Sequence, residues 1–231
     1  MSGWSRSLVA RWAGALYLAY VVANVIASQL GNIGLSDDQA LRTTITDQEM
    51  SFRLGLVAAI GSALLFVLTA WALYTLLRDV NEPLALLLLV LNAVGAAVQC
   101  ASYLPLLAVL ARGEAQGLTG SQLDDLAMLA VAMHHTGFVT AQLFFSAWLF
   151  PLGWLVLRSG FLPRFLGWLL LLDAVGVSFW FLQAFLAPGH PGLSYPSWAV
   201  GFIAEVGFAL WLVIKGVSPD ERHDAAPGRN R

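Results

Sequence analysis

Two acidic residues, Asp173 and Glu205, are the strongest candidates for chemistry in this sequence. Each interrupts a run of apolar residues that is long enough to cross a lipid bilayer, and each lies near the middle of its run. An ionisable side chain at that depth costs about 2.5 to 3.5 kcal/mol on insertion scales, so it usually faces a partner, a cavity or a pathway. Removal from water favours the neutral form of a carboxyl, and two carboxyls that meet can share a proton. The alternative is that each neutral acid donates a structural hydrogen bond to a neighbouring helix.

Amide side chains in the other apolar runs could complete a polar cavity around the two acids. Asn92 and Gln99 lie on one helical face of their run, Gln142 lies in the next run, and Asn24 lies in the first. Trp180 lies on the same face as the first of the two acids. Polar groups of this kind serve equally well to hold helices together, where one hydrogen bond contributes about 0.6 kcal/mol on average. All five residues are therefore candidates for ligand binding, with a structural role as the alternative.

An imidazole and a guanidinium are expected at the outer mouth of such a cavity. His135 would be turned inward as a hydrogen-bonding or proton-transfer group, and Arg53 would lie near it at the start of the second apolar run. The adjacent residues His134 and His135 point about 100° apart on a helix, which makes them a poor pair for chelating one metal ion. Binding of haem through a single histidine stays open.

Signatures of the common catalytic classes are absent. The sequence contains no HExxH, no GxSxG, no paired-glutamate motif of intramembrane proteases and no phosphate-binding glycine loop. The one cysteine, Cys100, excludes an internal disulfide and any cysteine-based zinc site. A three-histidine zinc site would need His134, His135 and His190 together, with one of the two acids helping. We therefore expect no metal and no cofactor, and enzymatic activity is uncertain with a preference against it.

The composition is that of a membrane protein. Hydrophobic residues make up 58% of the chain and charged residues 11%, with a mean hydropathy of +0.73. A helix needs about 20 apolar residues to span the hydrocarbon core, and its backbone groups must be satisfied internally. Six stretches qualify, at 11–29, 53–77, 84–111, 137–157, 164–187 and 197–214. The predicted fold class is all-α, an integral membrane bundle of six transmembrane helices whose main partner is the lipid bilayer.

The distribution of basic residues predicts the orientation of these helices. With the N-terminus inside, the cytoplasmic side carries most of the 12 Lys and Arg residues, and only Arg42, Arg53 and Arg112 lie outside. This asymmetry predicts that both termini lie in the cytoplasm. The net charge of −2 and the scattered basic residues argue against nucleic-acid binding. Residues 1–217 are predicted to form one domain, and the polar segment 218–231 a disordered cytoplasmic tail.

The predicted outer loops contain helix signals. Capping patterns that begin at Ser36 and at Thr46 predict a short surface helix followed directly by the second run. An unbroken helix over 121–158 would be about 57 Å long, which exceeds the thickness of a membrane. Either Gly137 breaks this helix or the helix projects outward, and Pro151 is expected to kink it.

Several segments point to a known family. The chain contains RWAGALYLAYVV, SFRLGLVAAI, ALYTLLRDVNEPLALL, FPLGWLVLRSGFLPRFLGWLLLL and FIAEVGFALWLVIKGV. These segments resemble successive blocks of a bacterial membrane family named domain of unknown function 4386, over nearly the whole chain up to Val217. The resemblance implies that Glu205 corresponds to the glutamate of the family's last helix, Arg53 to the arginine that opens its second helix, and His135 to a histidine on its fourth. The family name implies no reaction.

Three functions are compatible with these observations. The leading hypothesis is a protein that binds or transports a small solute, with proton coupling through Asp173 and Glu205. The second is an intramembrane enzyme acting on lipid, with His135 and a carboxylate as acid and base. The third is a structural or accessory membrane subunit whose polar groups only lock the bundle together. The sequence specifies no oligomeric state.

Overall fold

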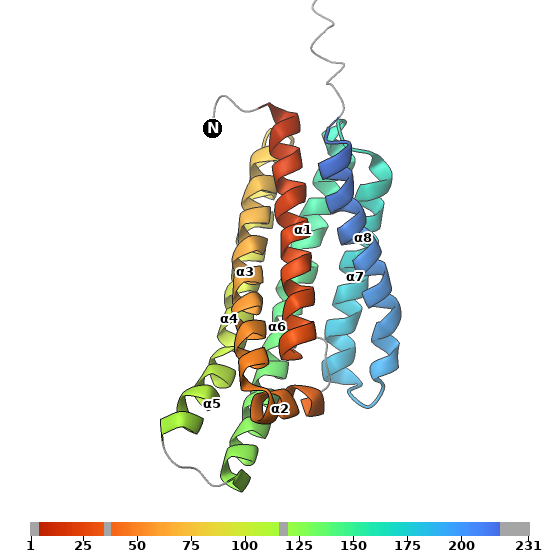
Figure 1. The fold of residues 1–231 in the computed structure, drawn as a ribbon. Helices are drawn as coiled ribbons and strands as arrows, with labels where there is room; N and C mark the ends of the chain where they lie inside the picture. The colour runs from red at the N-terminus through yellow and green to blue at the C-terminus, as the bar shows by residue number, and fades with distance from the viewer. Residues whose placement is uncertain (1–4, 35–37, 116–119, 218–231) are drawn as a thin grey trace, which may run out of the picture.

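The described residues form eight α-helices and contain no β-strand, which confirms the predicted all-α class (Figure 1). The computed structural model describes residues 5–34, 38–115 and 120–217. The helices are α1 (Arg6–Gly31), α2 (Asp38–Asp47), α3 (Glu49–Leu77), α4 (Glu82–Ser102), α5 (Leu104–Ala115), α6 (Gly120–Ser159), α7 (Arg164–Leu186) and α8 (Tyr195–Ile214). A 3-10 turn, η1 (Pro191–Ser194), leads directly into α8.

Six helical stretches of the described residues are long and apolar enough to cross a membrane, as the sequence predicted. They are Arg6–Gly31, Glu49–Leu77, Glu82–Ala111, Asp124–Ser159, Arg164–Leu186 and Gly192–Ile214. Many of their outward-facing side chains are large and apolar, for example Trp168, Leu172 and Ile203. Exposed apolar surface on this scale marks a face that another apolar phase covers, and a lipid bilayer is such a phase.

Capping residues in the sequence fix several helix ends. Ser5 precedes α1, and its hydroxyl oxygen accepts a hydrogen bond of 3.3 Å from the backbone N–H three residues later. Asn81 precedes α4, and its side-chain amide oxygen accepts a hydrogen bond of 3.0 Å from the backbone N–H of Leu84. α1 ends at Gly31, and the next residue, Asn32, adopts the left-handed conformation with φ of 52°. α2 lies where a short surface helix was predicted, although the capping residue Ser36 falls outside the described residues.

Two apolar clusters form the core of the bundle. The larger one surrounds Trp148 of α6, whose ring centroid lies 5.0 Å from that of Phe66 on α3 and 6.3 Å from that of Tyr17 on α1. The smaller one lies at the α2 end of the bundle, where Phe52 of α3 and Leu106 of α5 are fully buried. Aromatic packing of this kind holds the long helices in a single arrangement.

The third predicted span, 84–111, is confirmed as a helical stretch, but it consists of two helices. α4 ends at Ser102, and α5 begins at Leu104 after a one-residue interruption at Tyr103. Pro105 accounts for the break because proline has no N–H to donate and its ring clashes with the carbonyl four residues earlier. The break turns α5 away from α4 (Figure 1).

α6 is continuous over its 40 residues, about 60 Å of helix. Gly137 therefore does not break it. A side chain on Gly137 would instead collide with α4, since an added Cβ would lie 2.7 Å from the Cβ of Ser102. The first turns of α6 project beyond the bundle together with α5 and α2, so the projecting alternative is the correct one (Figure 1).

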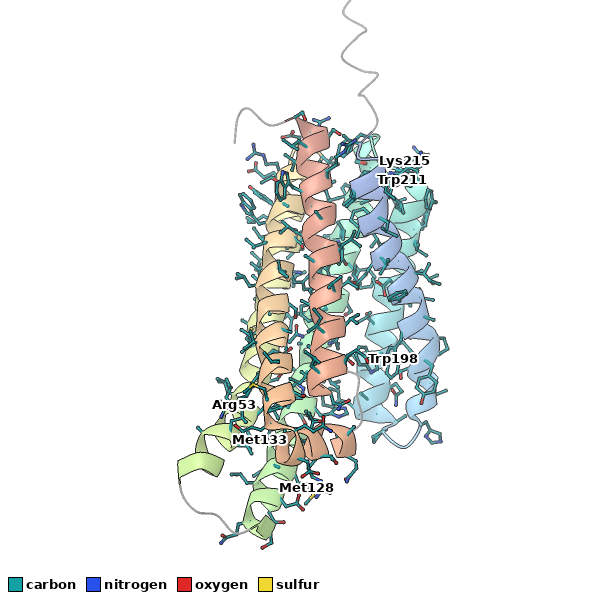
Figure 2. All side chains as sticks on the ribbon, viewed as in Figure 1. Arg53, Met128, Met133, Trp198, Trp211 and Lys215 are labelled. Atoms are coloured by element: carbon teal, nitrogen blue, oxygen red, sulfur yellow. The ribbon has the colours of Figure 1, made fainter. Side chains whose placement is uncertain are left out.

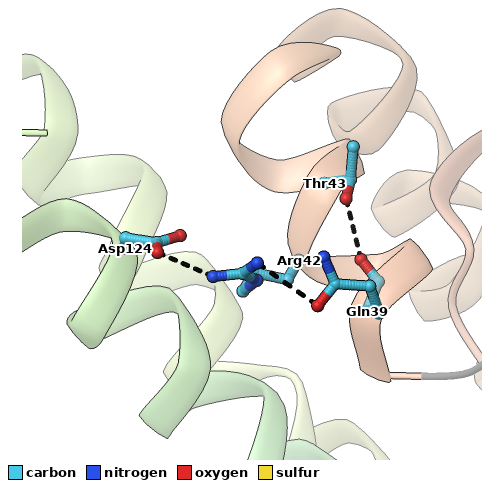
Figure 3. A network of polar contacts seen from close by, with 4 residues as sticks. All are labelled: Gln39, Arg42, Thr43 and Asp124. Atoms are coloured by element: carbon cyan, nitrogen blue, oxygen red, sulfur yellow. Dashed lines mark hydrogen bonds and ion pairs between the residues drawn. The ribbon is translucent and has the colours of Figure 1, made fainter. Parts of the chain in front are cut away.

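An ion pair fastens α2 to the projecting part of α6. Nη1 of Arg42 on α2 donates to Oδ2 of Asp124 on α6 at 2.6 Å, while Nη2 donates to Gln39 at 3.2 Å (Figure 3). Thr43 donates back to the Gln39 carbonyl at 2.9 Å within α2. The short helix is thus held across the end of the bundle by side chains from two elements.

The start of α1 and the end of α8 lie at the same end of the bundle (Figure 1). Lys215 and Trp211 mark that end, while Arg53 and the projecting residues Met128 and Met133 mark the opposite one (Figure 2). Arg6 also lies at the end that carries the termini, where its guanidinium is 3.5 Å from Asp79. The predicted disordered tail, residues 218–231, falls outside the described residues.

Candidate functional site

A cavity of about 360 Å³ lies between α1, α4, α6, α7 and α8. Its volume is within the range of about 300 to 1,000 Å³ that is usual for small-molecule sites. Six of the nine residues singled out in the sequence line it: Asn24, Gln99, Gln142, Asp173, Trp180 and Glu205. These side chains come from five different helices, so the bundle, and no single segment, builds the site.

Asp173 is the most unusual residue of this cavity. It lies on the inward face of α7, on the same helical stripe as the buried residues Leu166, Leu170 and Ala174. Its side chain is fully buried, at 0% exposure, and neither carboxyl oxygen has a hydrogen-bond partner among the described residues. Buried polar groups are nearly always hydrogen-bonded, so an orphaned carboxyl that lines a cavity calls for an occupant of that cavity.

Room for the Asp173 carboxyl comes from a glycine on the facing helix. An added Cβ on Gly201 of α8 would lie 2.8 Å from Oδ1 of Asp173. The same two helices also meet where Gly176 of α7 faces Ser197 of α8. A Cβ added to Gly176 would lie 3.4 Å from the Cβ of Ser197. Small residues therefore let α7 and α8 approach each other beside the acid.

Glu205 contributes the second carboxyl from α8. It lines the same cavity and is partly accessible. Tyr17 belongs to the aromatic core beside Phe66, Trp148 and Phe208. No hydrogen bond of 3.5 Å or less joins the Tyr17 hydroxyl to any described residue. Asp173 and Glu205 therefore line one cavity from two neighbouring helices, α7 and α8.

Three amides surround the acids but are bound mainly within their own helices. Asn24 donates to the carbonyl four residues earlier in α1 at 2.9 Å, and Gln142 does so in α6 at 3.2 Å. Gln99 donates to the Tyr103 hydroxyl at 3.0 Å, and its carbonyl oxygen is buried with no partner in the described part of the chain. The cavity thus offers at least one free amide acceptor in addition to the two acids.

Aromatic rings form much of the remaining wall. The rings of Trp180 on α7 and Trp198 on α8 have centroids 5.7 Å apart and planes 79° apart. Phe138 of α6 lies next to Trp180 at 6.3 Å between centroids. All three residues line the cavity. The lining of the cavity therefore combines carboxyl and amide groups with aromatic rings.

The remaining predicted residues lie elsewhere. Asn92 is fully buried, and neither atom of its amide has a partner among the described residues, but it does not line the cavity. Arg53 lies at the end of the bundle that carries α2, bonded to Glu49 at 2.7 Å. His135 is exposed and lies 3.1 Å from Asp38 of α2. The structure brings neither Arg53 nor His135 to the cavity.

The prediction that His135 turns inward is wrong, because its neighbour occupies the inward face. His134 is buried, stacks on Tyr103 at 5.4 Å between ring centroids, and has Nδ1 3.1 Å from the Ser102 hydroxyl. The sequence contained the signal for this. His134 is in phase with the buried residues Ala127 and Ala141 of α6, whereas His135 is about 100° away from that stripe.

Groups that could hold a metal ion are few. Within the described residues, no three side chains of His, Cys, Asp or Glu come together. The cavity contributes two such groups, Asp173 and Glu205.

Comparison with known sequences gives two matches. A sequence model of the family described as "Domain of unknown function (DUF4386)" matches residues 12–216. A protein of the archaeon Archaeoglobus fulgidus, named only as an uncharacterized protein, is 30% identical over 158 residues, which cover 66% of this chain and 78% of that protein. No solved structure matches this chain.

Proposed function

Because the chain belongs to the DUF4386 family, a name that states no activity, we propose its function from the cavity itself. We propose that this protein binds a small solute between α1, α4, α6, α7 and α8, and moves it with proton coupling through Asp173 and Glu205. The observation that carries the proposal is the buried Asp173 carboxyl, which lines the cavity with both oxygens unpartnered among the described residues. Ionisable groups inside a membrane bundle are functional by default, since they are costly to retain.

We further propose that both termini lie in the cytoplasm and that the membrane is the inner, cytoplasmic membrane of a bacterium. The orientation is supported by the basic residues at one end of the bundle. α1 begins and α8 ends there, and helix termini at that end carry Arg6, Arg78, Arg158 and Lys215. Such an excess of basic residues is typical of the cytoplasmic side.

The positions of the site residues do not favour an intramembrane enzyme. That hypothesis required His135 beside one of the two acids, and His135 is an exposed residue paired with Asp38 outside the cavity. The accessory-subunit hypothesis requires the polar groups to be paired with one another, which the unpartnered Asp173 oxygens do not favour.

Cysteine labelling tests whether the cavity admits solutes. In a Cys100→Ala background, Ser197→Cys places a thiol in the cavity wall, whereas the matched Ser62→Cys places one at a buried position of α3 that does not line the cavity. We expect neutral N-ethylmaleimide to modify the Ser197→Cys variant at least about tenfold faster in proteoliposomes, because only that site connects to the cavity. Equal rates at the two positions would refute the solute-binding proposal.

A solute screen then identifies what the cavity admits. Compounds that occupy it slow the labelling of the Ser197→Cys variant, and their binding is followed by proton uptake or release in weakly buffered solution. The wild-type protein is compared with Glu205→Gln, in which the second carboxyl cannot bind a proton. Proton exchange that is unchanged in Glu205→Gln would remove the coupling role from this residue.

A further inference from the structure

We infer that the cavity takes an organic cation, that is, an ammonium ion with apolar substituents. This inference rests on the proposed function, and it adds the chemical class of the solute.

The first argument is charge. Asp173 and Glu205 line the cavity, and none of the lining residues is Lys, Arg or His. Among the described residues, no cationic side chain therefore lines the cavity beside these two acids. A buried carboxylate without a countercharge is costly and binds a proton instead, so a cationic solute that replaces this proton gains more from the site than a neutral or anionic one.

The second argument is the aromatic wall. Tyr20, Phe138, Phe145, Trp180, Trp198 and Phe202 line the cavity, so rings are present on α1, α6, α7 and α8. The near-perpendicular rings of Trp180 and Trp198 form a corner of the cavity, about 10 Å of helix from Asp173 on α7 and from Glu205 on α8. The faces of aromatic rings attract cations within about 6 Å, and cages of such rings recognise quaternary ammonium groups.

The same wall argues against a bare metal ion. Ca²⁺ takes about six to eight oxygen ligands, and Mg²⁺ keeps several of its waters. Apolar rings cannot replace that hydration. An ammonium ion whose charge is covered by carbon substituents needs no such set of oxygens, so it matches a cavity that combines two carboxyls with aromatic faces.

The accessible residues at the cavity edge favour a partly apolar solute. Val25 of α1 and Phe202 of α8 line the cavity and are 51% and 64% exposed. Both side chains belong to helices that are apolar enough to span a membrane, so this edge faces the surroundings of the bundle. An amphiphilic cation that partitions into the bilayer can reach the acids by this route.

The test compares two probes of the same shape. Benzyltrimethylammonium and neopentylbenzene differ by replacement of the charged nitrogen with carbon. Their binding to the full chain in nanodiscs is measured by equilibrium dialysis, with empty nanodiscs subtracted. We expect the ammonium to bind about tenfold or more tightly than the neutral probe, because only it gains from the buried carboxylates.

Variants assign the effect to the cavity. Asp173→Asn keeps the shape of the side chain and should lose the preference for the ammonium, whereas the control Asp79→Asn, at the exposed Arg6 pair, should retain it. If Asp173→Asn does not fold, Glu205→Gln serves in its place. The wild-type comparison of the two probes needs no variant at all.

The possible outcomes separate the two proposals. Equal binding of both probes, or no binding of the ammonium, overturns the inference of an organic cation. The solute-binding proposal would still stand if the Ser197→Cys variant is labelled rapidly, because that reagent is neutral. A preference for the ammonium that persists in both Asp173→Asn and Glu205→Gln would also overturn the inference, since the charge would then be recognised elsewhere.

Discussion

Gly201 on α8 faces the carboxyl of Asp173 on α7 so closely that a methyl group on the glycine would lie 2.8 Å from Oδ1. The contact is between a backbone position and the tip of a side chain. The carboxyl can turn away while the two helices stay in place, so this contact controls where the acid points more than whether the bundle folds.

Gly201→Ala should therefore move the Asp173 carboxyl without unfolding the protein. We expect the free energy of unfolding to change by less than about 1 kcal/mol, because the gain in helix propensity offsets the crowding. The infrared bands that disappear in Asp173→Asn should shift in Gly201→Ala. The control is Gly207→Ala on the same helix, where an added Cβ meets nothing within 4 Å and the bands should stay unchanged.

Gly55→Ala should weaken the bundle. An added Cβ on Gly55 of α3 would lie 2.5 Å from the Cα of Gly31, so two backbones must separate. We expect a destabilisation of about 1 to 3 kcal/mol, the usual cost of overpacking, seen as a lower melting temperature in one detergent. Gly61→Ala on the same helix has open space around it and should be neutral or slightly stabilising. Equal melting temperatures for the two variants would contradict the close contact of α1 and α3.

His134 and His135 should respond very differently to replacement. His134→Ala removes a buried ring that stacks on Tyr103 and bonds Ser102, so it should cost about 1 to 3 kcal/mol. His135→Ala alters an exposed residue and should stay within about 0.5 kcal/mol. Thermal denaturation of both variants measures the two effects. A larger loss of stability in His135→Ala than in His134→Ala would contradict the inward position of His134 on α6.

Arg42→Gln should loosen α2 locally. The ion pair with Asp124 is partly exposed and contributes less than about 1 kcal/mol, so the melting temperature should hardly change. Amide hydrogen exchange within residues 38–47 should become faster, because local opening responds to a local contact. Arg78→Gln, at the opposite end of the bundle, serves as the matched control. Unchanged exchange in 38–47 would mean that other contacts hold α2.

Reporter fusions test the orientation in the membrane. Green fluorescent protein fused after Val217 should fluoresce, because it folds in the cytoplasm. Alkaline phosphatase inserted at Gly189, between α7 and η1, should be active because it needs the oxidising exterior. The reverse pattern would place the termini outside.

The helical spans could be predicted from the sequence because hydropathy over about 20 residues decides them. The break at Tyr103 could not be seen in this way, since the residues on both sides of it are equally apolar. Pro105 was the local signal for it. The break also has a tertiary contact, because Tyr103 stacks on His134 of α6, in addition to the local hydrogen bond that Tyr103 accepts from Gln99.

The candidate site could be predicted only in part, because periodicity identifies a face of a helix but not the depth of a cavity. Asn92 and Gln99 share the buried face of α4, and about 10 Å of helix separates them. Of the two, only Gln99 lines the cavity. His134 and His135 show a second difficulty. Which of two adjacent residues faces inward depends on where the neighbouring helix lies.

The unbroken course of α6 has a mechanical consequence. Its projecting turns carry Asp124, the anchor of α2, and its middle carries Phe138, Gln142 and Phe145, which form part of the cavity wall. The only proline within the described helix, Pro151, comes after all of them. Between the anchor and the wall the helix is therefore a stiff rod. A push or twist applied to α2 from outside the bundle would be transmitted along this rod to the cavity as a rigid displacement, with no joint to absorb it.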